Sequence, residues 1–185
     1  MCARNDEEDA AIETKKAFED YDALIEAINP LLDGCYEFAG ISREDLPVIY
    51  IAWQNDVFPL YYSLLDKNLQ VNLTKYTAAD FSSEAVRRDF VRDVFVELRT
   101  HFQHRFLEEK YGASMTRNLL LRYITLDEDS KETNLFEEDG LKTAQAWAEM
   151  YFAGKKLGTW QEQKAELEQL ITADALLAII QKCFE

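Results

Sequence analysis

Two glutamates and two histidines stand at helical spacing near the middle of the chain. Glu97, His101, His104 and Glu108 follow one another at intervals of four, three and four residues. Positions three or four apart share one face of an α-helix, so these side chains can lie together. Carboxylate and imidazole groups at such spacings can hold a divalent transition metal, as they do in helical bundles. This face is the sharpest local cluster of residues that could do chemistry.

The rest of a metal set is missing from the sequence. Di-iron bundles repeat a Glu-x-x-His motif on a second helix, whereas this chain has only two histidines. The three cysteines lack metal-binding spacing, and the phosphate-loop, nucleophile-elbow and HExxH motifs are absent. Ordinary hydrogen bonds between these histidines and their neighbouring glutamates are the simpler interpretation. We therefore expect a protein without a cofactor that is not an enzyme, and keep a metal-dependent helical-bundle enzyme as the alternative.

The cluster lies on residues 82–111, which have the clearest helical pattern of the chain. Ser82 or Ser83 suits the N-cap, and Gly112 suits the C-terminal stop. A helix of this length would measure about 45 Å at ~1.5 Å per residue, so other segments must pack along it. The sequence thus predicts a mainly α-helical fold, a single-domain multi-helix bundle over 1–185 around this central helix, with residues 1–8 frayed. The apolar face comprises Val91, Val94, Phe95, Leu98, Phe102 and Phe106.

Most other segments also show helical patterns. A stripe over residues 9–28 predicts a first helix that Pro30 ends or bends. Residues 42–56 favour a buried helix, although their run of β-prone residues would also suit a strand. Thr159 with Glu162 predicts a capping box, and Thr172 is expected to cap a final apolar helix.

Two segments leave room for a small two-stranded β-ribbon. Residues 69–76 alternate between apolar and polar positions, which is the clearest strand pattern in the chain. Residues 119–126 are either the second strand or the end of a helix that begins near Ser114. If both are strands, they are expected to pair across the central helix.

Charge is the strongest global feature of the composition. The chain has 35 acidic and 20 basic residues, a net charge of −15, and the acids gather in residues 1–45 and 127–140. Such a field repels nucleic acid and anionic membranes and attracts basic proteins, although it also simply favours solubility. No apolar run approaches the ~18 residues of a membrane span, and the acidic N-terminus does not resemble a signal peptide. We expect a cytoplasmic protein that contacts neither membrane nor nucleic acid directly.

These observations favour an acidic protein-binding inhibitor or regulator, most concretely an immunity protein or antitoxin that neutralises a basic toxin such as a nuclease. A DNA mimic is a further alternative, which would need carboxylates spaced like phosphates along one surface. A dimer also stays open, because the apolar segments beginning at residues 46 and 173 can be buried within one chain or between two. The candidate partner-binding residues are Asp33, Tyr36, Glu37, Phe38, Asp127, Glu128, Asp129, Phe136, Glu137, Glu138 and Asp139.

Overall fold

The computed structural model describes residues 3–40, 46–52, 58–124 and 135–184. Side chains are described within these ranges from residue 20 to residue 181, apart from residues 52 and 124. The described part of the chain is mainly helical, with six α-helices and one small mixed β-sheet. The predicted helical class is therefore confirmed.

Helix α2, Glu84–Tyr111, lies almost where the sequence predicts the central helix. Ser83 occupies the N-cap position without a side-chain hydrogen bond, and Gly112 ends the helix at a φ of 86°. The whole predicted apolar face is buried. Helix α2 contacts five other elements: α1, α3, α4, α5 and β2. It therefore contributes buried side chains to the core along most of its length.

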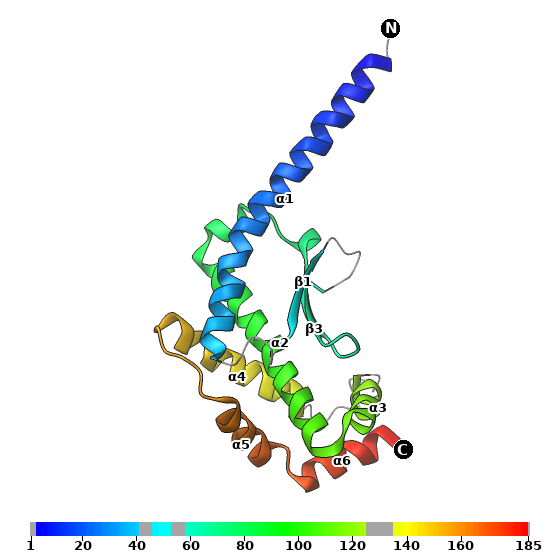
Figure 1. Cartoon of the computed structure of the whole chain (residues 1–185), viewed down its shortest axis with the longest axis vertical. Coiled ribbons are helices and arrows are strands. Elements are labelled where there is room, and N and C mark those ends of the chain that lie inside the picture. Colours follow the sequence, from blue (N-terminus) through cyan, green and yellow to red (C-terminus); the bar gives the residue numbers. More distant parts are fainter. Residues whose placement is uncertain (1–2, 41–45, 53–57, 125–134, 185) are drawn as a thin grey trace.

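Helix α1, Ala3–Ala39, is longer than predicted and runs through Pro30. Proline costs about 3 kcal/mol inside a helix because one hydrogen bond is lost. Leu32, Cys35 and Phe38 continue the buried stripe beyond Pro30, and each buried apolar side chain contributes about 1.5–3 kcal/mol. Burial outweighs the local penalty, so the first of the two predicted alternatives, that Pro30 ends this helix, is wrong. The N-terminal part of α1 extends away from the rest of the molecule (Figure 1).

The sheet has three strands rather than two, in the order β1-β3-β2. β1, Val48–Ala52, is parallel to β3, Asn68–Asn72, whereas β2, Leu60–Ser63, is antiparallel to β3. The helix favoured for residues 42–56 is therefore wrong over the described residues 48–52. Alternate side chains of β1 face opposite sides: Ile49 packs against the core, whereas Val48 and Tyr50 are 74% and 55% exposed.

A tight turn joins β2 to β3 and sets the position of both strands against α2. Lys67 has a φ of 53°, and its amide donates a 2.8 Å hydrogen bond to the Ser63 carbonyl. After β3, two short 3₁₀ helices, η2 (Leu73–Lys75) and η3 (Asp80–Ser82), lead into α2. Thr77 donates hydrogen bonds to the Asp80 carboxylate through both its amide and its hydroxyl, at 2.8 Å each.

Four further helices follow α2 in the described part of the chain: α3 (Ala113–Ile124), α4 (Leu135–Phe152), α5 (Trp160–Leu170) and α6 (Ala173–Phe184). Residues 119–124 belong to α3, so the strand alternative is wrong there, and residues 125–126 lie outside the described residues. The predicted Thr159–Glu162 capping box is present, and Thr172 Oγ accepts a hydrogen bond from the amide of Ala175. Among the described helices, none has a stretch both long and apolar enough to cross a bilayer.

Candidate functional site

Tyr62 brings strand β2 to the two histidines of α2. Its hydroxyl lies 3.1 Å from His104 Nδ1 and 3.3 Å from His101 Nδ1. The hydroxyl has one proton, so it can donate to only one of the two imidazoles and must accept from the other. The Tyr62 hydroxyl therefore lies between the two imidazoles. The metal-dependent alternative would instead need a metal ion between them.

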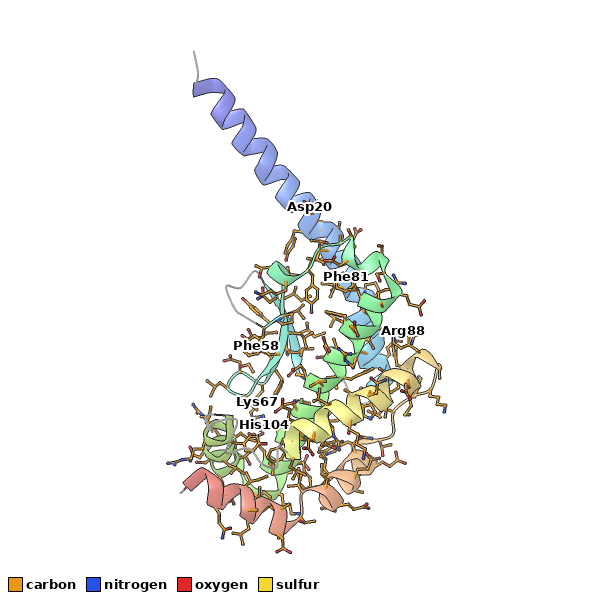
Figure 2. The ribbon with its side chains drawn as sticks, turned by 180° about the vertical axis from the view of Figure 1, so that it is seen from behind. Asp20, Phe58, Lys67, Phe81, Arg88 and His104 are labelled. Carbon is orange, nitrogen blue, oxygen red and sulfur yellow. The ribbon has the colours of Figure 1, made fainter. Side chains whose placement is uncertain are left out.

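The polar chain continues from His104 to the surface. His104 Nε2 lies 3.4 Å from Glu108 Oε1, and Glu108 Oε2 lies 2.8 Å from the ammonium of Lys67. Figure 2 labels Lys67 and His104, the two ends of this polar chain. A proton on Nε2 of His104 suits the Glu108 carboxylate and leaves Nδ1 to accept from the Tyr62 hydroxyl. His101 then donates to Tyr62. Desolvation by burial lowers the pKa of His104, so this imidazole is neutral at pH 7.

Glu97 lies one helical turn before His101 and receives the other polar group of Tyr62. The Tyr62 amide donates a 2.7 Å hydrogen bond to Glu97 Oε2. Desolvation raises the pKa of Glu97 to about 7; the Tyr62 hydrogen bond acts against this shift, and the charge of Asp93 adds to it. A carboxyl group that changes charge near neutral pH is a candidate functional group.

The four proposed metal ligands lie along one face of α2, but they are not arranged around an ion. Their described contacts are with Tyr62 and Lys67, and His104 pairs with Glu108. Among the described residues, no three His, Cys, Asp or Glu side chains are placed to hold a metal ion together. The residues therefore do not fit the metal site of the alternative hypothesis.

A cavity of about 340 Å³ adjoins this cluster, between α2, α3 and α4. Glu97 and His104 form part of its wall, so the near-neutral carboxyl and the imidazole reach the same space. A cavity of this volume is at the small end of ligand-binding pockets. The other lining residues are Val96, Thr100, Gln103, Leu120, Tyr123, Phe136, Glu137, Gly140 and Leu141.

No family model, curated protein or solved structure matches this chain. Its site must therefore be interpreted from its own geometry.

Three of the predicted partner-binding residues have structural roles instead. Phe38 and Phe136 are core residues, 3% and 7% exposed, so neither can be a surface anchor. Asp139 forms a two-point ion pair with the buried Arg99, at 2.6 and 3.1 Å, and also accepts from Gln103. These roles could not be predicted from the sequence. The local pattern around an aromatic or acidic residue in an acidic stretch does not show whether its side chain is buried.

Tyr36 is partly buried, and its hydroxyl donates a 2.5 Å hydrogen bond to the carbonyl of Pro47. This hydrogen bond links α1 to the residue before β1. Only part of the Tyr36 side chain is therefore accessible to a partner. Four other predicted acids, Asp33 and Glu37 on α1 and Glu137 and Glu138 on α4, are exposed. Asp127, Glu128 and Asp129 lie outside the described residues.

The exposed acids of α1 and α4 lie in two separate groups. Phe38, beside Glu37, contacts Tyr151 near the C-terminal end of α4 at a ring-centroid distance of 5.9 Å. Glu137 and Glu138 occupy the first turn of the same helix, about 20 Å away along the α4 axis at ~1.5 Å per residue. The larger of the two groups is on α1.

Tyr62 and Lys67 were not predicted as members of the cluster, because both come from the β2–β3 hairpin, which lies far from α2 in the sequence. The exposed aromatic groups Tyr50 and Phe58, which are 55% and 61% exposed, were also not predicted. A period of two through Val48–Ala52 would have placed Val48 and Tyr50 on one outward face, had that segment been taken as a strand.

Proposed function

We propose that this chain is a cytoplasmic, non-enzymatic protein that binds and neutralises a basic protein, most concretely an immunity protein or antitoxin against a basic toxin such as a nuclease. One observation carries the proposal: four exposed carboxylates stand in a row on one face of α1. The row consists of Asp22, Glu26, Asp33 and Glu37.

The spacing of the row follows from the helix. Its members are four, seven and four residues apart, which places them within a narrow stripe about 22 Å long. The opposite side of this same segment is fixed in the core by Leu24, Ile28 and Leu32. The carboxylates therefore project from a backbone that is already ordered, and a partner loses little entropy in ordering them.

The net charge of −15 supports the same partner class, because the long-range field attracts a basic protein before contact. Interfaces also need apolar anchors at their centres. Tyr50 and Phe58 are exposed aromatic residues that can take that role, in place of the buried Phe38 and Phe136. The DNA-mimic alternative is the narrower form of this proposal, in which the carboxylate row takes the place of phosphates.

The test uses a panel of purified basic nuclease toxins, with acidic proteins of equal size as controls. Affinity and association rate are measured for the full chain at low and high salt, with and without duplex DNA as competitor. The test variant is Glu26→Lys with Glu37→Lys on the row. The matched control, Glu149→Lys with Glu168→Lys, makes the same change in charge at exposed positions of α4 and α5.

We expect a nuclease to bind the wild type with salt-dependent association, and the row variant to bind at least about tenfold more weakly. The control pair should change affinity by no more than about threefold, because neither position belongs to the row and exposed charges outside the contact surface are largely screened. Competition by DNA would identify the mimic form. Equal losses for both pairs would reduce the effect to bulk charge, and no binding to any toxin of the panel would overturn the proposal.

A further inference from the structure

Two oxygen atoms in the wall of the cavity accept no hydrogen bond from the residues that the structure describes. Glu97 uses Oε2 for the Tyr62 amide, and its Oε1 accepts no hydrogen bond within the described part of the chain. Gln103 donates through Nε2 to the Phe136 carbonyl and to Asp139 Oδ2. Both are acceptors, which fixes the amide orientation and leaves Gln103 Oε1 without a described donor.

Neither oxygen atom is fully enclosed by the surrounding protein. Among the described side chains that are not exposed, few polar atoms are both fully enclosed and without a hydrogen bond, and Thr116 Oγ1 is one of them. Glu97 Oε1 and Gln103 Oε1 are not in this set, and both residues line the cavity. The Thr100 hydroxyl donates a 3.1 Å hydrogen bond to the Val96 carbonyl, so its oxygen can only accept further hydrogen bonds. The polar wall is therefore rich in acceptors.

The groups that could oppose a positive charge in the cavity are few. His104 is a lining residue, but its ring nitrogens face Tyr62 and Glu108, and burial lowers its pKa, so it is neutral at pH 7. Glu137, at the α4 side, adds negative charge. No described lysine or arginine lines the cavity.

The remaining wall is aromatic and aliphatic. The rings of Tyr123 and Phe136 meet edge to face with centroids 5.3 Å apart, beside Leu120 and Leu141. Aromatic faces attract an organic cation, and aliphatic walls suit the carbon chain that carries it. This combination fits a cation with an apolar body better than a bare metal ion.

Gly140 gives an independent reason to regard the cavity as a site. It lies inside α4, where glycine costs roughly 0.5–1 kcal/mol relative to alanine. A Cβ atom at this position would meet only Val96 Cγ1 at 3.8 Å, an ordinary contact, so packing does not require glycine. What the missing side chain provides is open volume, because Gly140 is part of the cavity wall.

We propose that this cavity binds an organic cation, an alkylammonium or guanidinium group, with the Glu97 carboxylate as its counter-ion. The cation is either a free amine or a lysine or arginine side chain of a protein partner; these two sources share one chemistry. The site is separate from the carboxylate row on α1, so either proposal can fail without the other.

Binding must depend on pH, because the cation needs Glu97 ionised. The groups that act on Glu97 are the Tyr62 amide from β2 and Asp93 from α2, and the titratable groups that share the cavity wall with it are His104 from α2 and Glu137 from α4. With a pKa of about 7, Glu97 is mostly protonated at pH 6 and mostly ionised at pH 8. Affinity should therefore be about tenfold higher at pH 8 than at pH 6.

The experiment is calorimetric titration of the full chain with agmatine, which carries both a guanidinium and an ammonium group, at pH 6 and pH 8. A neutral alcohol of similar length serves as the ligand control. Glu97→Gln removes the counter-ion, and Gly140→Leu fills the cavity without touching the carboxyl. Glu168→Gln, an exposed position on α5, is the matched control for the loss of one negative charge. Thermal melting establishes that each variant is folded.

We expect saturable binding of agmatine at one site, weaker at pH 6, with no binding of the alcohol. Glu97→Gln and Gly140→Leu should each weaken binding by about tenfold or more, and Glu168→Gln should leave it unchanged. A short lysine- and arginine-containing peptide is then titrated in the same way. Binding of the peptide through the same residues assigns the site to a protein side chain, and binding of agmatine alone assigns it to a free amine. Absence of saturable agmatine and peptide binding at pH 8, or undiminished binding by folded Glu97→Gln, would overturn the proposal.

Discussion

The backbone amide of Tyr62 and the carboxyl of Glu97 are joined by a 2.7 Å hydrogen bond that ties edge strand β2 to the middle of α2. The same tyrosine reaches His101 and His104 through its hydroxyl. One residue of the hairpin therefore fixes three polar side chains of the helix. The stability and the titration behaviour of this cluster should consequently be linked.

Tyr62→Phe should destabilise the protein by about 1–3 kcal/mol, because it removes the hydroxyl and leaves imidazole nitrogens buried without that partner. Urea unfolding at pH 7 measures the change. Tyr61→Phe is the matched control: its hydroxyl bonds to Gln70 Oε1 at 2.7 Å in a more accessible position. Tyr61→Phe should lower the free energy of unfolding less than Tyr62→Phe does. Equal losses would show that the contacts of Tyr62 with the two histidines add no stability.

Glu97 should make the folded state less stable as pH rises. Its pKa is about 7 in the folded protein and near 4.5 in an unfolded chain, so the folded state holds the proton more tightly. The resulting stabilisation is complete below pH 4.5 and is lost as pH rises to 7, by up to roughly 3 kcal/mol. Glu97→Gln should remove this dependence and gain stability above pH 7. Free energies of unfolding at pH 5 to 8 test the difference between the two proteins.

His104 should act in the opposite direction. Burial lowers its pKa below the ordinary 6.5, so the unfolded chain takes up a proton first as pH falls. In the wild type, the stability lost through His104 as pH falls is offset by the stability gained as Glu97 takes up a proton. In Glu97→Gln the offset is gone, and stability should fall as pH drops below about 6.5. A Glu97→Gln profile that stays flat between pH 7 and 5 would contradict the burial of a neutral His104.

Asp139→Ala should cost about 3–5 kcal/mol, because it leaves the Arg99 guanidinium buried without its carboxylate. The two side chains are 3% and 10% exposed. The control is Asp89→Ala, which removes a 3.0 Å pair to Arg92 between exposed side chains and should cost well under about 1 kcal/mol. Chemical denaturation of both variants checks the contrast, which would vanish if the Arg99 network were open to solvent.

Two helical glycines should respond to alanine with opposite signs. Gly140→Ala should stabilise by about 0.5–1 kcal/mol, because the new Cβ meets only Val96 at 3.8 Å and the unfolded chain loses freedom. Gly34→Ala should destabilise, because a Cβ there would collide with the Tyr151 hydroxyl. Melting temperatures of the pair provide the measurement. A lower melting temperature for Gly140→Ala would mean that the cavity is already filled at this position.

The features that the sequence could predict are local ones. The bounds of α2 follow from an apolar stripe and from Gly112, and the capping box at Thr159 and Glu162 is complete within four residues. These patterns depend on neighbours along one helix, so the printed sequence contains all the information they need. The four-residue face from Glu97 to Glu108 was found for the same reason.

The errors come from contacts between distant segments. β1 is a strand because β3, some twenty residues further along, pairs with it in parallel, whereas its apolar run alone also suits a buried helix. The partners of the predicted metal face, Tyr62 and Lys67, likewise arrive from a hairpin about forty residues before Glu108. Spacing within α2 could gather the residues but could not show that a hydroxyl would lie between the imidazoles.

The order β1-β3-β2 also constrains how the protein can fold. The central strand follows both of its neighbours along the chain, so β1 has no strand partner until Asn72 has been synthesised. The β2–β3 hairpin, closed by the turn at Lys67, can form from adjacent residues, whereas β1 must wait and then dock across a longer loop. Until then Ile49 and Ile51 lack the cover that β3 gives them. The first strand to leave the ribosome is thus the last to join the sheet, and its amides should exchange with solvent before those of the hairpin.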